Sequence, residues 1–169
     1  ASASAIYGIY AAAVYLATLP GGWIGYTILG QQKTILYGGI IIMFGHLMLA
    51  IPNMNFFYLG LILVVVGTGL LKPNISAIVG GLYHNNPSMR EAGFTIFYMA
   101  INLGSILGFF ICGYLGESIG WHYGFGAAGI GMLLGVLQYK FNVKSLGEIG
   151  REPTSLVSSE TKKSYKRIL

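Results

Sequence analysis

The chain has 169 residues, of which 54% are hydrophobic and 9% are charged, and its formal net charge is +5. This composition excludes both a soluble globular core and a disordered segment, and it is typical of an integral membrane protein. Most of the positive charge lies towards the end of the chain, without interleaved aromatic rings. This pattern indicates a cytoplasmic membrane flank rather than a nucleic-acid-binding surface.

The acidic residues exclude several kinds of enzyme. The chain has no Asp, and its five acidic residues, all Glu, lie outside the apolar runs. A Ser–His–acid set therefore cannot form within the membrane, and no group of His, Cys and Glu residues has the spacing of a metal site. We expect no catalytic residues, no metal and no cofactor.

Five apolar runs are each long enough to cross a membrane as a helix, since about 20 residues span the hydrocarbon. We expect these helices at residues 6–29, 34–52, 56–83, 92–115 and 121–141. The expected connections are a tight turn at 30–33, a polar turn at 53–55 and a polar loop at 84–91, where Pro87 should stop any helix. Residues 142–169 are expected to form a basic cytoplasmic tail or linker. The predicted fold is an all-α integral membrane bundle.

The cations predict the orientation of the bundle. Five spans place residues 30–33, 84–91 and 142–169 on one side, which is basic, whereas the other side has no Lys or Arg. By the positive-inside rule the basic side is cytoplasmic, so residue 1 lies outside a cell membrane that the chain crosses several times. A chain that starts outside without an exported leader indicates that a preceding helix is missing. We interpret the chain as part of a larger protein; the alternative is a complete five-helix protein.

The third span contains a single charge, Lys72, followed at once by Pro73. A lysine near the bilayer centre costs about 2.5–3.5 kcal/mol on insertion scales, and an ionisable residue at this depth is by default a functional-site hypothesis. Pro73 cannot donate to the Gly69 carbonyl, and membranes tolerate such irregular backbone only where protein or water surrounds it. The alternative is a buried lysine that braces helix packing. Because the spans hold no carboxylate, a charged Lys72 needs a partner from another helix, a substrate carboxylate or water.

The fourth span carries Tyr98, Asn102 and Ser105, whose spacing of four and three residues places them on one helical face. Together with Lys72 on the preceding span, this face predicts a shared polar cavity. The first span adds Tyr15 at about mid-depth. The alternatives are an Asn102 amide that only bridges two helices, for about 0.6 kcal/mol, and a Tyr15 hydroxyl that only bonds a backbone carbonyl.

Two further features concern packing. Pairs of small residues four apart allow helix backbones to approach closely. Such pairs are Gly104 with Gly108, Gly131 with Gly135, and Ser76 with Gly80, although 26 glycines make this spacing common by chance. His46 lies among apolar residues of the second span, and we interpret it as a core histidine with satisfied hydrogen bonds.

Several segments resemble the proton-dependent oligopeptide transporters of the major facilitator superfamily. They are GTGLLKPNISA at 67–77, REAGF at 90–94, FTIFYMAINLGSI at 94–106, GWHYGFGAAGIGMLLGVLQY at 120–139 and LGEIGREP at 146–153. Residues 94–106 fit the second signature of that family at every position. The resemblance implies that the spans are helices two to six of an amino-terminal six-helix bundle. The first helix and the carboxy-terminal bundle of the same protein would then lie outside this chain.

The resemblance also implies roles for individual residues. Lys72 would couple proton movement to the peptide site, and Tyr15, Tyr98 and Asn102 would line the substrate pocket. The first signature of the family falls on GGWIGYTILGQQKTI at 21–35. It departs from the family at two positions, because Tyr26 stands where the family has an Asp and Thr27 where a basic residue is common. The charges that steady the cytoplasmic helix ends during rocking in the superfamily are therefore absent here.

These observations favour a fragment of a proton-coupled symporter of di- and tripeptides that works by alternating access in the lipid bilayer. One alternative is a related transporter of nitrate or amino-acid derivatives. Another is a helical scaffold subunit that transports nothing. Lys72 argues against a scaffold, because a scaffold gains nothing from an unpaired cation at depth.

The predicted orientation can be tested by labelling introduced cysteines in the membrane-embedded protein, with the native Cys112 replaced by Ser. We expect an impermeant thiol reagent to label Met54→Cys from outside and Ser88→Cys only from the cytoplasmic side, because the cations gather on the side of Ser88. The reverse pattern would contradict both the orientation and the numbering of the spans.

Overall fold

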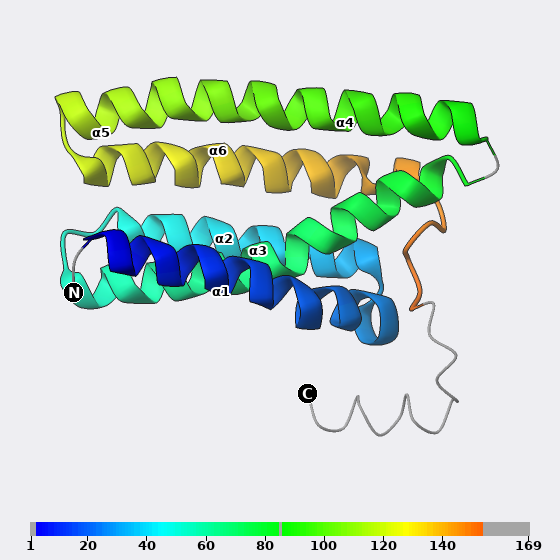
Figure 1. Ribbon diagram of the computed structural model, residues 1–169, viewed down its shortest axis with the longest axis horizontal. Coiled ribbons are helices and arrows are strands. Elements are labelled where there is room, and N and C mark those ends of the chain that lie inside the picture. Colours follow the sequence, from blue (N-terminus) through cyan, green and yellow to red (C-terminus); the bar gives the residue numbers. More distant parts are fainter. Residues whose placement is uncertain (1–2, 85, 154–169) are drawn as a thin grey trace.

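A computed structural model describes residues 3–84 and 86–153, which form helices aligned along one long axis (Figure 1). The helices are α1 (Ala3–Ile24) with a π-helical end η1 (Gly25–Leu29), α2 (Gln31–Leu49), α3 (Met54–Leu82), α4 (Pro87–Gly108) continued by the π-helical η2 (Phe109–Gly113) and by α5 (Tyr114–Ser118), α6 (Trp121–Asn142), and the short 3₁₀ helix η3 (Val143–Leu146). The predicted all-α bundle is confirmed.

Four stretches in the described part of the chain are long and apolar enough to cross a membrane, at residues 3–29, 31–49, 54–82 and 87–118. They correspond to the first four predicted spans. The expected fifth span, α6, is not among these four. Its 22 residues would extend about 33 Å, which is enough to cross. However, His122, Gln138 and Lys140 near its ends lower its mean hydropathy.

Two predicted connections are shorter than expected. The turn at 30–33 is reduced to Gly30, whose φ of 83° only glycine adopts readily, and α2 already begins at Gln31. The expected loop at 84–91 was wrong for residues 87–91, because α4 begins at Pro87. Proline is favoured in the first turn of a helix, where its missing N–H has no partner to lose. The Asn86 side chain caps this turn by accepting a hydrogen bond from the Met89 N–H at 3.2 Å.

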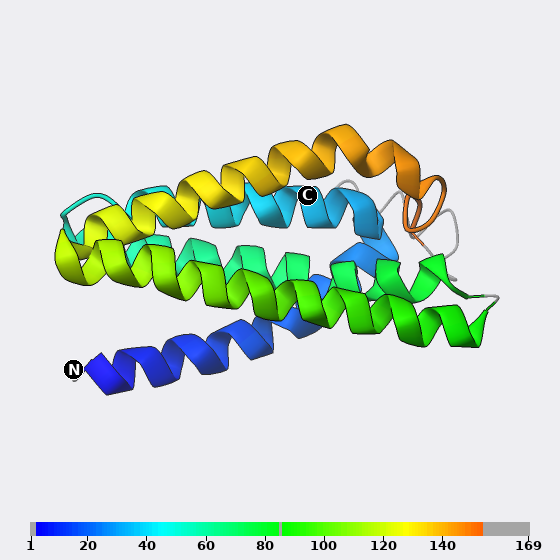
Figure 2. The same cartoon turned by 90° about the horizontal axis from the view of Figure 1, so that it is seen from above.

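The helix α3 is central to the packing. It contacts α1 on one side and α2 more extensively on another, and α6 packs on the far side of α2 (Figures 1 and 2). The joined helix α4–η2–α5 contacts α6 and, more sparsely, α3. The buried apolar residues accordingly lie on α2 and α3; they are Ile35, Ile42, Leu49, Val64 and Ile78. In contrast, α4 has no buried residue.

Glycines allow α3 to approach its neighbours at backbone distance. A Cβ added to Gly67 would lie 2.7 Å from the Gly38 carbonyl oxygen, and one added to Gly60 would lie 2.8 Å from the Gly45 carbonyl oxygen. Most of the small-residue pairs that the sequence suggested do not lie where two helix backbones approach closely. A Cβ on any glycine of the pairs 104 with 108 and 131 with 135 would meet nothing within 4 Å among the described residues.

The segment after η3 docks on the bundle. The Gln32 side-chain amide donates to the carbonyls of Gly147 (3.0 Å) and Ile149 (2.9 Å), and the Gln32 backbone N–H donates to Gly150 (2.9 Å). The Tyr139 hydroxyl donates to the Gln32 carbonyl at 3.2 Å. The first three bonds tie the predicted tail to the start of α2, and the fourth ties α6 to the same residue. The rest of that tail, residues 154–169, lies outside the described residues.

The glycine contacts predict the effect of a matched pair of substitutions. We expect Gly67→Ala to lower the free energy of unfolding by about 1–3 kcal/mol, because the new methyl group overpacks the α2–α3 contact. The control Gly131→Ala adds the same methyl group where nothing lies within 4 Å, and its better helix propensity should leave stability equal or raise it by up to about 1 kcal/mol. Thermal unfolding of the purified protein in detergent checks this, and equal melting temperatures would contradict the packing.

Candidate functional site

The structure brings two of the predicted site residues together, Lys72 of α3 and Tyr15 of α1. The Lys72 Nζ lies 4.7 Å from the centre of the Tyr15 ring. This geometry is a cation–π contact, which contributes about 0.5–1 kcal/mol at exposed sites and about 2 kcal/mol when desolvated. Both side chains are exposed on the surface of the described chain. The ring therefore stabilises the cation from one side and leaves the other side open.

The backbone next to Lys72 is irregular in the way the sequence predicts. Pro73 lies inside α3, so the Gly69 carbonyl has no amide partner one turn later. That carbonyl faces Gly21 of α1, where any Cβ would collide with it. Figure 1 shows α3 changing direction over its second half, as expected of a helix interrupted by proline. The kink and the lysine are thus parts of one α1–α3 contact.

Tyr98, Asn102 and Ser105 lie on α4 and are all exposed. The Asn102 side-chain amide donates to the Tyr98 carbonyl at 2.9 Å, and the Ser105 hydroxyl donates to the Ile101 carbonyl at 2.9 Å. Both bonds stay within α4, so Asn102 does not bridge two helices within the described residues. It also makes no hydrogen bond with Lys72 there. The polar face of α4 is present, and the hydrogen bonds that Asn102 and Ser105 donate are both local to this helix.

A cavity of about 640 Å³ lies beside the first half of α4, and Tyr98 is one of its lining residues. The others are His84, Pro87, Arg90, Glu91, Phe94 and Thr95. The Tyr98 ring stacks on Phe94 at 6.3 Å between ring centres, and the Arg90 guanidinium lies 5.9 Å from the Phe94 ring. Tyr98 therefore borders this cavity, whereas Asn102 and Ser105 do not line it.

The sequence reasoning missed Asn74. Its side chain is 2% exposed, and the amide nitrogen donates to the Gly21 carbonyl of α1 at 3.0 Å and to the Leu70 carbonyl of α3 at 2.7 Å. An Asn within an apolar run, directly after Lys72 and Pro73, was the signal available in the sequence. It could not reveal the α1 partner, which only the helix packing brings near.

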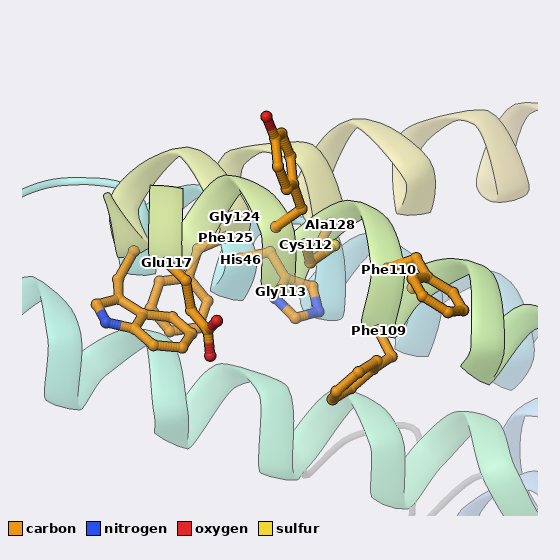
Figure 3. A pocket seen from close by; sticks show the side chains of 12 residues that line it. His46, Phe109, Phe110, Cys112, Gly113, Glu117, Gly124, Phe125 and Ala128 are labelled. Atoms are coloured by element: carbon orange, nitrogen blue, oxygen red, sulfur yellow. The ribbon is translucent and has the colours of Figure 1, made fainter. Parts of the chain in front are cut away.

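A second pocket, of about 460 Å³, lies between α2, α6 and the η2–α5 segment (Figure 3). Glu117 stands at one end, Phe109 and Phe110 at the other, and His46 lies between them. The buried His46 Nδ1 has no hydrogen-bond partner within residues 3–84 and 86–153. The interpretation of His46 as a satisfied core histidine was therefore wrong for this part of the chain. The rest of the lining is mainly aromatic residues and glycine.

Charge pairing is sparse in the part of the chain that the structure describes. The ion pair found there joins Arg151 and Glu148 at 2.6 Å, and Lys72 has no carboxylate partner in that part. No group of three or more His, Cys, Asp or Glu side chains in the described ranges could hold a metal ion. No carboxylate of the described chain therefore occupies the open side of the Lys72 ammonium, which is left accessible to an incoming anion.

The comparisons with known proteins agree with this architecture. Residues 32–159 match the family model PTR2, described as the POT family. An uncharacterised transporter of Bacillus subtilis, YclF, is 46% identical over 95% of this chain and 33% of its own length. A di-/tripeptide transporter of Lactococcus lactis subsp. lactis is 42% identical over 98% of this chain and 34% of its own. The chain therefore spans about a third of the length of these relatives.

Solved structures show the same helix arrangement. The crystal structure of a peptide transporter POT in complex with sulfate superposes with a TM-score of 0.90 at 41% identity, covering 97% of this chain and 34% of that one. A POT family transporter in complex with 5-aminolevulinic acid superposes with a TM-score of 0.83 at 39% identity, covering 95% and 33%. With most of the chain matched by the family model and nearly all of it by these structures, the chain belongs to the POT family of membrane transporters.

Proposed function

We propose that this chain forms part of a proton-coupled symporter that moves di- and tripeptides across the cell membrane by alternating access. The observation that carries this proposal is Lys72, an ionisable group on a proline-kinked, membrane-spanning helix with no carboxylate partner in the described chain. Ionisable residues in such positions mark proton relays and substrate pathways. The named function of relatives over the same residues supports the peptide substrate.

Lys72 is proposed to couple protons to the peptide. When charged, it attracts a carboxylate, either that of a peptide or one from another part of the protein. When the carboxylate leaves or is protonated, the ammonium is left with the Tyr15 ring as its nearest stabilising group. A change in the partner of Lys72 therefore changes the energy of the kinked helix α3. Secondary transporters alternate access by rocking packed helices around a midplane site, so such a change can favour one state of the transporter over the other.

Tyr15, Tyr98 and Asn102 are proposed to contact the peptide. A tyrosine supplies an apolar wall with one polar tip. Asn102 can donate to and accept from a peptide bond, although its amide now donates to its own helix. That bond is short-range and exposed, so a substrate can replace it at little cost. The open face of α4, without a buried residue, leaves room for such a substrate.

The remaining two thirds of the relatives' length is proposed to complete the site. It would supply a first helix with a carboxylate for Lys72 and a second bundle that forms the other wall of the pocket. We propose that the complete site works without a resident cofactor. Residue 1 is proposed to lie outside and residues 142–169 in the cytoplasm. Tyr26 and Thr27 lie in η1, so gating at this end would rely on packing instead of the usual charges.

A second candidate function is transport of an amino-acid derivative. A POT family transporter 39% identical to this chain was crystallised with 5-aminolevulinic acid, which carries a carboxylate and an amine as a peptide does. Lys72 would serve either substrate, because it recognises the carboxylate that both share. Gradient-driven uptake of each radiolabelled compound, measured separately in proteoliposomes, separates these functions.

The role of Lys72 predicts the effect of removing its charge in the full-length protein. We expect Lys72→Ala to reduce peptide uptake driven by a proton gradient by at least about tenfold, while peptide counterflow without a gradient is partly kept. The bundle should remain folded, since removing an unpaired cation also removes a desolvation cost. Proteoliposome uptake beside a thermal melt measures both effects.

Lys72→Arg provides the matched control for charge alone. It keeps the cation but replaces a compact ammonium, which can lose its proton, by a broad guanidinium that stays protonated. We expect it to fail in driven uptake as well. Normal driven uptake by a well-folded Lys72→Ala would mean that the lysine only braces the helices, as a scaffold would require.

The proposed substrate face of α4 can be tested by thiol accessibility in a Cys112→Ser background. The cysteine thiolate attacks a water-borne electrophilic reagent, and the thiolate forms only where water reaches the sulfur. We expect Asn102→Cys to react readily and a dipeptide to slow the reaction. The control Leu134→Cys, on an exposed apolar stripe of α6, should stay unreactive in lipid. Equal rates at the two sites would contradict a solvated pocket at Asn102.

A further inference from the structure

Two polar side chains are buried in the described chain, Thr34 and Asn74. Thr34 bonds within its own helix, since its hydroxyl donates to the Gly30 carbonyl at 2.8 Å. Asn74 is different because its amide nitrogen reaches another helix. A side-chain amide has two N–H donors, and here one carbonyl lies on α1 and the other on α3, at 3.0 and 2.7 Å. Both donors are used, so Asn74 has none left for a substrate.

The surrounding glycines show that α1 is shaped to receive this amide. Any Cβ at Gly25 would collide with the Asn74 side chain, and any Cβ at Gly21 would collide with the Gly69 carbonyl. One residue along, a Cβ at Gly22 would lie 3.4 Å from the Pro73 ring. The α1 and α3 backbones therefore meet around the proline, and the Asn74 amide donates a hydrogen bond across this contact.

The register of α1 against α3 also determines the position of the Tyr15 ring. Tyr15 precedes Gly21 by six residues, which is about 9 Å along α1, and Lys72 precedes Asn74 by two. A slip of α1 by one residue would move the Tyr15 ring by about 1.5 Å along the helix and rotate it by about 100°. The cation–π contact at 4.7 Å would not survive such a rotation, because attraction is limited to about 6 Å from the ring centre.

We propose that Asn74 is a positioning residue for proton coupling: by clamping α1 to α3 at Gly21, it holds the Tyr15 ring over the Lys72 ammonium. The inference rests on the proposed function of Lys72. Asn74 acts through the helix contact and touches neither the peptide nor the proton. Losing the clamp should therefore impair the step that depends on Lys72 more than the steps that need only binding and rocking.

The test uses the full-length protein in proteoliposomes and compares Asn74→Ala with Thr34→Val. Thr34→Val also removes a buried hydrogen bond from a side chain to a backbone carbonyl. This bond joins Thr34 to Gly30, four residues earlier, and lies far from Lys72 in the sequence. We expect Asn74→Ala to reduce gradient-driven uptake about fivefold or more, a coupling factor typical of linked sites, and to shift the external pH of half-maximal uptake. Peptide counterflow should change by less than about twofold. Thr34→Val should lower the melting temperature without changing the ratio of driven uptake to counterflow.

Asn74→Ser covers the case in which the alanine variant does not fold. Its hydroxyl can still bond the Leu70 carbonyl one turn back, but it is too short to reach Gly21, so it should uncouple like Asn74→Ala. A parallel fall of driven uptake and counterflow would overturn the proposal, as would an unchanged ratio in a folded variant. Lys72→Ala is measured alongside: if it transports normally, the proposed function fails and the inference with it. If it fails while Asn74→Ala and Asn74→Ser couple normally, only the inference is wrong.

Discussion

The close approach of α3 to its two neighbours is the constraint on which the rest of the structure depends. Helices in a membrane gain no hydrophobic energy from each other, since lipid is as apolar as their side chains, so they associate through backbone proximity and polar contacts. Glycines on α1, α2 and α3 provide that proximity, most visibly where Gly38 faces Gly67 and Gly21 faces Gly69. Larger residues at these positions would separate the helices and remove the dispersion contacts that hold them together.

The same approach makes the irregular backbone at Pro73 tolerable. A carbonyl without its helical partner is costly in hydrocarbon, but here it lies against the α1 backbone at Gly21. The helix can therefore carry a proline beside a lysine without exposing unpaired backbone to lipid. Lys72 is left with an aromatic ring on one side, which stabilises the ammonium without neutralising it.

The candidate site residues of the described helices lie exposed, on surfaces that are open on one side. The α1–α3 contact carries Lys72 and Tyr15, and α4 carries Tyr98 and Asn102, but within the described residues no hydrogen bond or cation–π contact joins the two groups. The helix α4 has no buried residue, and His46 keeps a buried nitrogen without a partner in the described chain. Such unmet surfaces fit a chain that spans about a third of the length of its relatives. The function of the whole transporter depends on what packs against these surfaces.

The sequence by itself determined the membrane class, the approximate helices and the special position of Lys72, because long apolar runs and a lone charge within them have few physical interpretations. It also carried the family signature, which the family model and the solved structures bear out. Residue preferences predicted the ends of helices less well than their existence. Pro87 was expected to stop a helix, but it is the first residue of α4.

Only the tertiary structure decided which small residues are in contact and which polar groups meet. The glycine pairs at 104 with 108 and 131 with 135 have the favoured spacing yet face nothing within 4 Å among the described residues, whereas Gly38 and Gly67 pack against each other from different helices. Asn74 could not be recognised from its neighbours, since its partner carbonyl lies 53 positions away in the chain. Spacing within one helix says which residues share a face. It does not say which helix that face will meet, because this depends on how all the helices pack together.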